Sequence, residues 1–391
     1  MTKLIVVAHQ SHTLVNLRFH LITDFLKAGL KVTALAPPDQ YFENARQKLN
    51  SIGVELLPLA VRNTSLNVFN DIKLFSTLKR YFRELKPDLL FFYSIKPVIF
   101  GSLAAKFSTR ARVNVMFPGL GYVFTGDSYK QRLLRFLIKP LYKWLLASVD
   151  NTFFHNADDA ALFLQSGLVK QNQVVLTDGS GVDTHHFAPL PYPQQLSFLF
   201  VGRLIRDKGI NEFIEAARCV KQQYPEVRFL IAGGLHNNPT GLTQSALDEL
   251  IQSGVVEYLG ELMDIREALK QASVFVLPSY REGLPRSALE AMATARPIIT
   301  TDAPGCREVV RLQQNGFLAP VKDVEHLVEF MHYFIEHPEA IAQMGAVSRE
   351  IAVQRFGVSR INRIMLEAMK IFPRIENEDM DAAKNITAHP L

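Results

Sequence analysis

The chain has few of the features that mark secreted, membrane-spanning or disulfide-rich proteins. It contains two cysteines, Cys219 and Cys306, among 391 residues, which excludes a disulfide framework and is typical of a reducing, cytoplasmic environment. The apolar run at the start, Leu4–Ala8, is too short for a signal peptide and is better interpreted as a first buried strand. The most apolar window, 89–105, is broken by a Lys-Pro pair, so we expect no transmembrane helix.

Length and composition indicate a globular protein of two domains. The 391 residues exceed a typical single domain, and 48% are hydrophobic while 21% are charged. Residues 1–190 carry 22 Lys and Arg against 13 Asp and Glu, a net charge of +9, whereas the remainder carries 21 against 25, a net charge of −4. A basic N-terminal half indicates an anionic partner, either a nucleic acid or a membrane. Because the basic stretch lacks helix-turn-helix, zinc and RNA-recognition signatures, we expect no nucleic acid.

Short apolar runs alternate with helical patterns in both halves, which predicts an α/β fold with parallel sheets covered on both faces. Prolines at 189, 191 and 193 separate the halves and predict an interdomain linker. We therefore predict one domain over 1–188, a linker over 189–195, a second domain over 196–357, and a disordered polar tail over 374–391. The predicted helices are Leu14–Ala28, Val68–Leu85, Asn211–Gln223, Asp264–Gln271, Ser287–Ala295, Val324–His337 and Ser359–Phe372.

A cationic turn opens the second half. The buried-strand run Phe198–Val201 is followed directly by Gly202 and Arg203, then by Lys208 and Gly209, and a helical pattern comes next. The glycines permit tight turns and a close backbone approach. Two cations on a strand-to-helix turn suit a diphosphate, since Arg203 can make a forked contact and Lys208 supplies a point charge.

Two carboxylates form the second motif. Glu282 is followed by the turn formers Gly283 and Pro285, and Glu290 lies in a helix pattern rich in Ala, Leu and Met. This spacing puts one acid in a loop and the other in the first turns of the helix. The unpaired backbone N–H groups at such a helix start are donors for an anionic or hydroxyl-rich ligand.

Together these motifs resemble the retaining glycosyltransferases of family 4. The resemblance rests on Gly202, Arg203, Lys208, Gly209, Pro278, Ser279, Glu282, Gly283, Glu290, Ala291, Asn315 and Gly316. It is dense from about 198 to 321 and weaker but collinear before that. It implies the GT-B fold, two facing Rossmann-like domains, with a final helix, 358–373, that crosses back to the N-terminal domain. The string 278–287 is similar to a bacterial subgroup that extends polyprenyl-diphosphate-linked sugars for capsule, O-antigen or N-glycan precursors.

The resemblance also implies the substrates. We expect a UDP-sugar donor, an undecaprenyl-diphosphate-linked sugar as acceptor, and α configuration kept. The similarity is greatest to α-1,3-N-acetylgalactosaminyltransferases, which favours GalNAc, while GlcNAc, galactose, glucose and uronate donors stay open. We expect no cofactor and no metal, because the Asp-x-Asp pair, Asp379 and Asp381, lies in the polar tail and the cations Arg203 and Lys208 take over the metal's electrostatic role. The alternatives are a soluble acceptor and a non-catalytic sugar-nucleotide-binding partner.

Matching the motifs residue by residue implies individual roles. Arg203 and Lys208 would stabilise the negative charge that grows on the departing diphosphate. Glu290 would accept hydrogen bonds from the ribose hydroxyls. Glu282 would position the donor sugar or stabilise an oxocarbenium ion, and a nucleophilic role is the less favoured alternative. The predicted catalytic residues are Arg203, Lys208 and Glu282; the predicted donor-binding residues are Gly202, Arg203, Lys208, Gly283, Leu284, Pro285, Arg286 and Glu290.

The predicted acceptor side departs from the family. Many family members place a His after the strand that we predict at Val113–Phe117, where this chain has Pro118 and then the loop of Gly119 and Gly121. No acid completes a dinucleotide signature there, which excludes a dehydrogenase. Arg18, at a helix start, would bind phosphate, or would be a plain surface cation. The predicted acceptor-binding residues are Arg18, Lys96, Gly119 and Gly121.

A basic, apolar helix is expected over 129–146. It has five cations, no acid, and a Leu/Phe/Trp face, which is the pattern of a helix lying on anionic lipid. The alternative is a surface helix whose apolar side packs on the domain core, and Pro140 should kink or divide it. We predict a peripheral protein on the cytoplasmic face of the bacterial inner membrane, in contact with inner-leaflet anionic lipid. The predicted membrane-contacting residues are Lys130, Arg132, Arg135, Lys139, Lys143 and Trp144.

Overall fold

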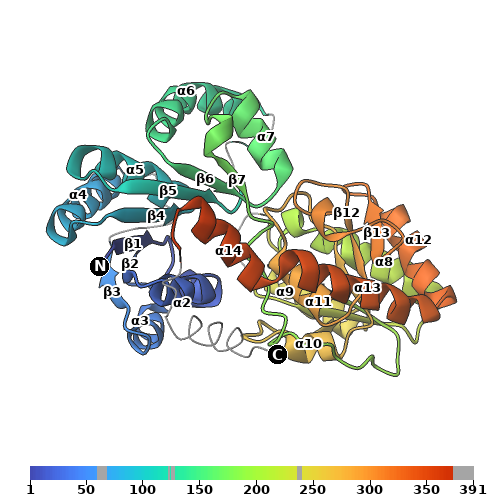
Figure 1. Cartoon of the computed structure of the whole chain (residues 1–391). Coiled ribbons are helices and arrows are strands. Elements are labelled where there is room, and N and C mark those ends of the chain that lie inside the picture. Colours follow the sequence, from blue (N-terminus) through green and yellow to red (C-terminus); the bar gives the residue numbers. More distant parts are fainter. Residues whose placement is uncertain (60–67, 122–123, 125–127, 236–239, 373–391) are drawn as a thin grey trace, which may run out of the picture. The chain divides into compact units, whose positions relative to one another are not determined.

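Two parallel β-sheets, one in each half of the sequence, form the framework of this protein and confirm the predicted α/β class (Figure 1). The computed structural model describes residues 1–59, 68–121, 124, 128–235 and 240–372. The predicted tail, 374–391, lies outside the described residues.

The first sheet has seven strands in the order β3-β2-β1-β4-β5-β6-β7. The pairs β3–β2, β2–β1, β1–β4 and β4–β5 are parallel, and Val7 lies opposite Phe92 in the β1–β4 pair. The chain therefore starts in the middle of the sheet, extends to one edge, and returns to β4. The strands are β1 (Lys3–Val7), β2 (Lys31–Ala36), β3 (Glu55–Pro58), β4 (Leu89–Tyr93), β5 (Arg112–Phe117), β6 (Asn151–Phe154) and β7 (Val174–Leu176).

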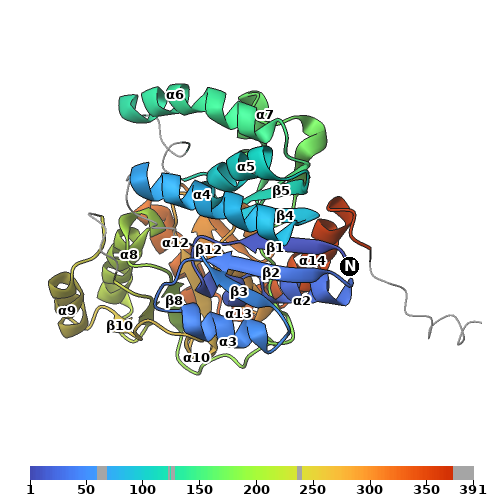
Figure 2. The same cartoon turned by 90° about the vertical axis from the view of Figure 1, so that its left-hand side faces the viewer.

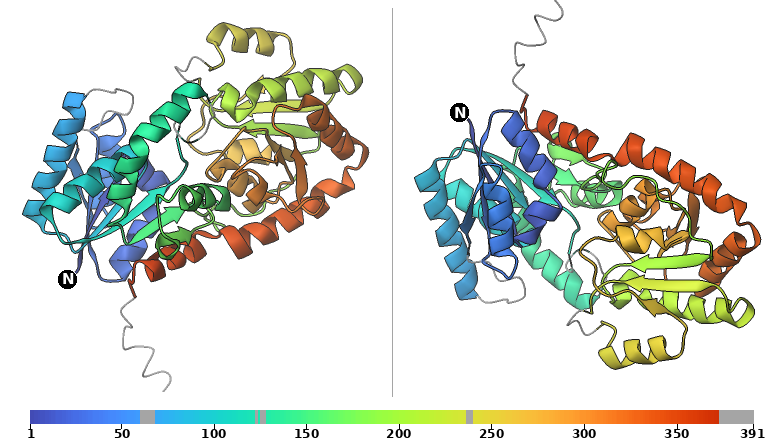
Figure 3. Two further views of the ribbon diagram at one scale, coloured as in Figure 1. Left: turned by 90° about the horizontal axis from the view of Figure 1, so that it is seen from above. Right: turned by 90° about the horizontal axis from the view of Figure 1, so that it is seen from below.

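Because the strand order extends in both directions from β1, right-handed crossovers are expected to put helices on both faces of the sheet. Helices α4 and α5 pack on each other (Figures 2 and 3). Helix α1 packs on α3. The long apolar runs of β1 and β4 are buried from both sides, as expected for a parallel sheet. The helices are α1 (His12–Asn16), α2 (Phe19–Lys27), α3 (Phe42–Asn50), α4 (Val68–Leu85), α5 (Ile95–Ser108), α6 (Tyr129–Leu146) and α7 (Ala157–Gln165).

One predicted helix of this half is wrong in its extent. The pattern Leu14–Ala28 is divided into α1 and α2, because Arg18 leaves helical geometry, with φ −122° and ψ 1°. The Arg18 side chain is turned inward and is 2% exposed. Helix α6, in contrast, runs through Pro140 without a break.

The second sheet has six strands, all parallel, in the order β10-β9-β8-β11-β12-β13. Helices α8 and α12 pack against each other, and so do α11 and α13. The strands are β8 (Ser197–Val201), β9 (Arg228–Ala232), β10 (Glu257–Tyr258), β11 (Val274–Leu277), β12 (Ile298–Thr301) and β13 (Gly316–Ala319). The helices are α8 (Ile210–Gln223), α9 (Gln244–Gln252), α10 (Arg266–Lys270), α11 (Arg286–Ala293), α12 (Val324–Glu336), α13 (Glu339–Phe356) and α14 (Val358–Ala368).

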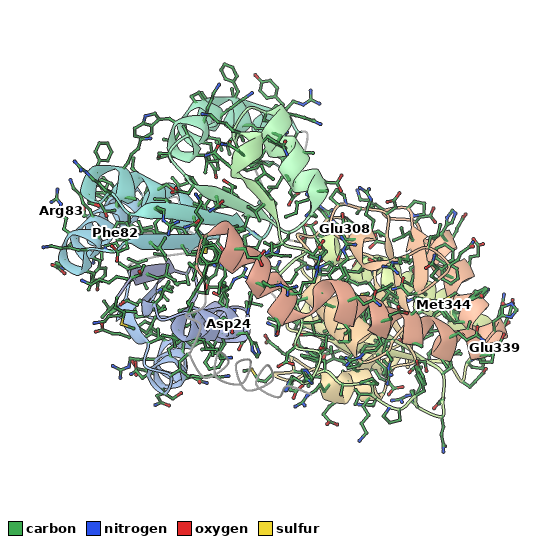
Figure 4. The ribbon with its side chains drawn as sticks, in the orientation of Figure 1. Asp24, Phe82, Arg83, Glu308, Glu339 and Met344 are labelled. Atoms are coloured by element: carbon green, nitrogen blue, oxygen red, sulfur yellow. The ribbon has the colours of Figure 1, made fainter. Side chains whose placement is uncertain are left out.

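The long helix α13 was not predicted from the sequence. Glu339 and Met344 mark its first turns in Figure 4. Its buried face includes Gly345 and Ser348, and these small or polar residues weaken the apolar pattern. A side chain at 345 would meet the Tyr192 hydroxyl at 2.2 Å and the Ala295 carbonyl at 2.3 Å. This position therefore needs a glycine, because its neighbours approach the helix backbone closely.

The chain divides into two compact units whose limits differ from those of the sheets. The first unit consists of residues 1–116, residues 141–152 and the described residues from Asn362 onward. The second consists of residues 117–140 and 153–361. One limit falls at Pro140 within α6, and another falls within β6. The interval between the last strand of the first sheet and β8 includes the predicted linker, 189–195. The predicted domain limits themselves stay a prediction.

The end of α14 belongs to the first unit, although α13 belongs to the second. The Asn362 side-chain amide donates to the carboxylate of Asp24 on α2 at 2.7 Å (Asp24 is labelled in Figure 4). Arg112 donates to the Met369 carbonyl at 3.0 Å, and Asn151 donates to the Ala368 carbonyl at 2.9 Å. These contacts fix the last turn of the helix and the residues after it.

Arg296 fastens the proline-rich stretch within the second unit. Its side chain is fully buried and donates to the carbonyls of Leu190 (2.9 Å) and Pro191 (2.7 Å). It also donates to the Leu269 carbonyl at 3.1 Å, and the guanidinium lies 4.7 Å from the ring centroid of Tyr192. Burial lowers the pKa of Arg296 to about 10. A buried cation is costly unless its donors are satisfied, so this site depends on all of its carbonyl partners.

The substitution Arg296→Lys should lower the free energy of unfolding by about 2 to 4 kcal/mol, because an ammonium group cannot reach the carbonyls that the planar guanidinium spans. Urea denaturation measures the change. The matched control is Arg218→Lys on α8, where the side chain is 52% exposed and pairs with an exposed Glu215; its effect should stay within about 0.5 kcal/mol. Equal effects of the two substitutions would contradict the assigned role of Arg296.

Candidate active site

The chemistry-bearing motifs of the second unit lie where the strand order of its sheet reverses. Strands β8 and β11 are neighbours in space, although β9 and β10 lie between them in sequence. In open parallel sheets, ligands bind beyond the carboxyl ends of the strands at such a reversal. The loop after β8 begins with Gly202, and the loop after β11 begins with Pro278. The structure therefore brings the two predicted donor motifs together at one edge.

The loop after β8 is held close to the loop after β11. Gly209 has φ +74°, and a Cβ there would lie 2.1 Å from the Pro278 carbonyl oxygen, so only glycine fits this turn. The Tyr280 amide donates to the Asp207 carbonyl at 3.0 Å. In the described part of the chain, the exposed side chain of Arg203 has no hydrogen-bond or ion-pair partner.

Lys208 and Glu282 meet as an ion pair. The ammonium of Lys208 contacts the Glu282 carboxylate, and the Ser279 hydroxyl donates to the same carboxylate oxygen at 2.8 Å. The two charged side chains are 20% and 11% exposed. The sequence indicated Lys208 and Glu282 as separate groups, and it did not indicate Ser279 as a partner.

The loop that carries Glu282 is fixed by its neighbours. The Glu282 amide donates to the Pro304 carbonyl at 3.0 Å, and the Thr301 hydroxyl donates to the Ser279 carbonyl. A Cβ at Gly283 would lie 1.6 Å from the Pro118 carbonyl oxygen and 3.5 Å from the Gly119 nitrogen. The structure thus places the loop after β5, a predicted acceptor-side loop, directly beside the predicted donor loop.

The second carboxylate lies on α11. Helix α11 begins at Arg286, directly after Leu284 and Pro285, and the Ser287 hydroxyl ties it to the Val201 carbonyl at 3.0 Å. The Arg286 guanidinium donates to Glu290 at 2.7 Å, and Glu290 has a side chain that is 10% exposed. Burial raises the pKa of Glu290, and Arg286 opposes this shift.

The predicted acceptor residues of the first unit lie at the carboxyl ends of β1 and β4. Lys96 pairs with Asp71 at 3.0 Å, and Ser94 contacts the His9 ring at 2.9 Å. The surface-cation alternative for Arg18 is wrong: its guanidinium contacts the Met116 sulfur at 2.7 Å and lies 5.3 Å from the ring centroid of Tyr93. Phosphate binding by Arg18 stays a prediction and would require this buried side chain to be uncovered.

Comparisons with known proteins agree with this geometry. A family model described as glycosyl transferases group 1 matches residues 182–350, and one described as glycosyl transferase 4-like matches residues 3–156. The chain belongs to these glycosyltransferases. It is 28% identical, over 89% of its length and 93% of the relative's, to the N,N'-diacetylbacillosaminyl-diphospho-undecaprenol alpha-1,3-N-acetylgalactosaminyltransferase of Campylobacter jejuni.

Two further proteins are similar. A UDP-Gal:alpha-D-GlcNAc-diphosphoundecaprenol alpha-1,3-galactosyltransferase of Escherichia coli is 28% identical over 71% of this chain and 74% of its own. The crystal structure of a Rickettsia africae glycosyltransferase superposes with a TM-score of 0.76 at 16% identity, covering 95% of this chain and 98% of that one. The structural likeness confirms the GT-B class and its pair of Rossmann-like domains.

Several residues that support the glycosyltransferase site were missed from the sequence. Asn156, Asp158 and Asp159 stand at the start of α7, and all three contact the donor-loop region of the same unit. Arg281 and Arg307 are their basic partners. Arg281 lay within the recognised motif, but its partners are more than 100 positions away, so no local spacing reveals the pairs.

Helix α6 exposes most of its apolar side chains. Phe136 is 75% exposed and Leu137 is 64% exposed, and Trp144 packs beside Phe107 with ring centroids 6.3 Å apart. Tyr142, Leu145 and Leu146 are buried, so the part of the helix after Pro140 is packed against the protein. Lys130, Arg132, Lys139 and Lys143 are exposed, and Arg135 is half-buried.

Neither a metal site nor a spanning helix is found among the described residues. No group of three or more His, Cys, Asp or Glu side chains in the described ranges could hold a metal ion. Within the same ranges, no helix combines the length and apolar character needed to cross a bilayer.

Glu290 generates a prediction about stability and pH. When folding raises the pKa of a carboxyl, the folded protein binds its proton more tightly than the unfolded chain does. The contribution of the carboxyl to the free energy of unfolding is therefore fully present below the unfolded-state pKa and is lost as pH rises through the folded-state pKa. The stability of the parent relative to Glu290→Gln should therefore fall as pH rises from about 4, near the ordinary glutamate pKa, through the raised pKa of the folded state. Urea denaturation of both proteins across this range tests it. Glu215→Gln, at a side chain that is 53% exposed, is the control and should show no such trend.

Proposed function

We propose that this glycosyltransferase transfers a sugar from a UDP-sugar to a polyprenyl-diphosphate-linked sugar, with retention of configuration and without a metal. The observation that carries the proposal is the cluster of Lys208, Glu282 and Ser279 at the point where the sheet order reverses, beside the exposed Arg203. The names of the two curated relatives supply the substrate class, since both refer to sugars on an undecaprenol diphosphate.

The two cations, Arg203 and Lys208, are the groups proposed to bind the diphosphate of the donor. Arg203 is exposed in the described structure and can offer its planar donors to phosphate oxygens. Lys208 can exchange its Glu282 partner for the diphosphate, whose charge grows as the bond to the sugar breaks. Cations placed in advance stabilise the transition state more than the ground state. This is the role that a bound metal ion plays in other sugar-nucleotide enzymes.

The proposed reaction balances without a separate base. The bond between the sugar C1 and the donor phosphate oxygen breaks, and a bond from C1 to the acceptor hydroxyl oxygen forms on the same face. The departing phosphate oxygen takes the acceptor proton. Glu282 lies against Lys208 and stabilises the positive charge that develops on the sugar ring. Glu290 accepts hydrogen bonds from the ribose of the donor, while Arg286 opposes the rise in the pKa of Glu290.

The donor sugar is proposed as GalNAc, from the name of the Campylobacter relative. Galactose is the second candidate, from the name of the Escherichia coli relative. The two sugars differ at C2, so a few side chains at the sugar site decide between them.

Contact with anionic lipid is proposed for α6. Exposed Phe136 and Leu137 stand beside exposed cations on a helix without acidic residues, and this combination favours an anionic bilayer surface. A pocket of about 380 Å³ lies on the second-unit part of this helix. Its lining of cations and rings suits a phosphate group with an apolar tail. The lining residues are Phe124, Arg132, Arg135, Phe136, Lys139, Ser166 and Leu168.

UDP release should depend on the lipid acceptor and survive chelation. The purified protein is incubated with UDP-GalNAc, UDP-GlcNAc, UDP-Gal, UDP-Glc or a UDP-uronate, with EDTA, and with or without a polyprenyl-diphosphate monosaccharide. Lys208→Ala should lower the rate by about 100-fold or more, whereas Lys221→Ala, at a half-buried lysine near the end of α8, should not. The anomeric coupling of the product tests retention. Turnover with a soluble sugar but with no lipid acceptor would overturn the acceptor assignment, and UDP binding without any turnover would favour a non-catalytic partner.

The double substitution Phe136→Ser and Leu137→Ser should weaken binding to vesicles that contain phosphatidylglycerol by about ten-fold, because two exposed apolar side chains no longer enter the interface. Co-sedimentation at two salt concentrations measures this. Met263→Ser, at a side chain that is 87% exposed, is the control outside α6. Equal vesicle binding of all three proteins would contradict lipid contact by α6.

A further inference from the structure

Helix α7 is joined to the predicted donor loop through one buried side chain. Asn156 is 3% exposed and stands immediately before α7. Its carbonyl oxygen accepts from the Asp159 amide at 2.8 Å, which caps the helix. Its amide group donates to the Gly283 carbonyl at 2.6 Å and approaches the Glu282 carbonyl at 3.4 Å. One side chain thus uses both of its ends, one for the helix and the other for the loop.

A buried ion pair lies beside this contact. The Asp159 side chain is fully buried and pairs with Arg281, the residue before Glu282, whose side chain is 24% exposed. Burial raises the pKa of Asp159, and Arg281 opposes the shift. Buried ion pairs contribute little net stability, because desolvation offsets the attraction. The pair therefore constrains geometry at Arg281 more than it stabilises the fold.

These contacts determine which way the loop presents its backbone donors. In a planar trans peptide, the C=O of one residue and the N–H of the next point in opposite directions. The carbonyls of Glu282 and Gly283 face Asn156, so the amides of Gly283 and Leu284 face the other way. The start of the loop is also fixed through the Glu282 amide, which donates to the Pro304 carbonyl at 3.0 Å. Two adjacent N–H groups thus point together, as donors for an anion or for sugar hydroxyls.

We infer that Asn156 is a positioning residue for the donor, with the Asp159–Arg281 pair holding the adjacent backbone. It acts by turning the Gly283 and Leu284 amides toward the diphosphate and sugar. The nucleoside is bound separately, through Glu290. The inference rests on the proposed function, and it predicts a specific division: loss of the Asn156 donor weakens binding of the diphosphate-sugar part and leaves binding of the nucleoside monophosphate unchanged.

The chain offers a substitution that separates capping from positioning. Asn156→Asp keeps an oxygen that can cap α7, since Asp is as good an N-cap as Asn. It replaces the donating amide with a carboxylate that faces two carbonyl oxygens and repels them. Thr243→Ala is the control for loss of a helix cap alone, because Thr243 caps α9 by accepting from the Ala246 amide at 3.2 Å.

Isothermal titration of the full-length protein with UMP and with the UDP-sugar gives the readout. For Asn156→Asp, the dissociation constant of the UDP-sugar should rise by about ten-fold or more, and that of UMP should stay within about two-fold. Asp159→Asn and Arg281→Gln should also raise the dissociation constant of the UDP-sugar. The dissociation constant for the variant with both substitutions should not exceed that of the more severe single variant. Thr243→Ala should change neither constant.

The possible contrary results are distinct. If Asn156→Asp binds the UDP-sugar as the parent does, or weakens UMP and UDP-sugar equally, the positioning role is overturned while the proposed function stands. If the parent itself binds no UDP-sugar, both fail together. Should Asn156→Asp not fold, the Asp159→Asn and Arg281→Gln variants decide the matter through the same UMP and UDP-sugar comparison.

Discussion

Close backbone packing among neighbouring loops is the constraint on which the rest of the site depends. A side chain at Gly209 would meet the Pro278 carbonyl at 2.1 Å, one at Gly305 would meet the Glu282 carbonyl at 2.3 Å, and one at Gly283 would meet the Pro118 carbonyl at 1.6 Å. Each obstacle is backbone, which cannot move aside as a side chain could. The positions of Lys208 and Glu282 are therefore set by contacts between main chains.

The constraint has an electrostatic consequence. Lys208 and Glu282 are brought together while both are mostly buried, so each charge is neutralised by the other. A diphosphate that takes Lys208 leaves Glu282 with the Ser279 hydroxyl and an uncompensated negative charge. That charge would then lie next to the sugar ring as positive charge develops there. In the proposed mechanism, a single ion pair therefore serves both the leaving group and the sugar, by exchanging partners when the donor binds.

The sequence allowed the strands and the donor motifs to be predicted, because both are local patterns. The apolar runs 31–36, 89–93 and 274–277 coincide with β2, β4 and β11, since continuous apolar runs bounded by turn formers are typical of strands in a parallel sheet. The inward turn of Arg18 and the role of Asn156 could not be predicted. Both depend on partners about 100 positions or more away, Met116 and Gly283, and no spacing rule records such pairs.

The two sheets have the same strand order but different chemistry at the reversal. In the second unit, the loops after β8 and β11 carry Arg203, Lys208 and Glu282, which are charged groups. In the first, the loops after β1 and β4 carry His9 and Ser94, and burial lowers the pKa of His9, which keeps the ring neutral. The charged groups near this edge are covered or paired, since Arg18 is buried and Lys96 pairs with a carboxylate. Arg203 at the other edge is exposed and can meet a phosphate. One strand order used twice therefore presents two edges of different electrostatic character.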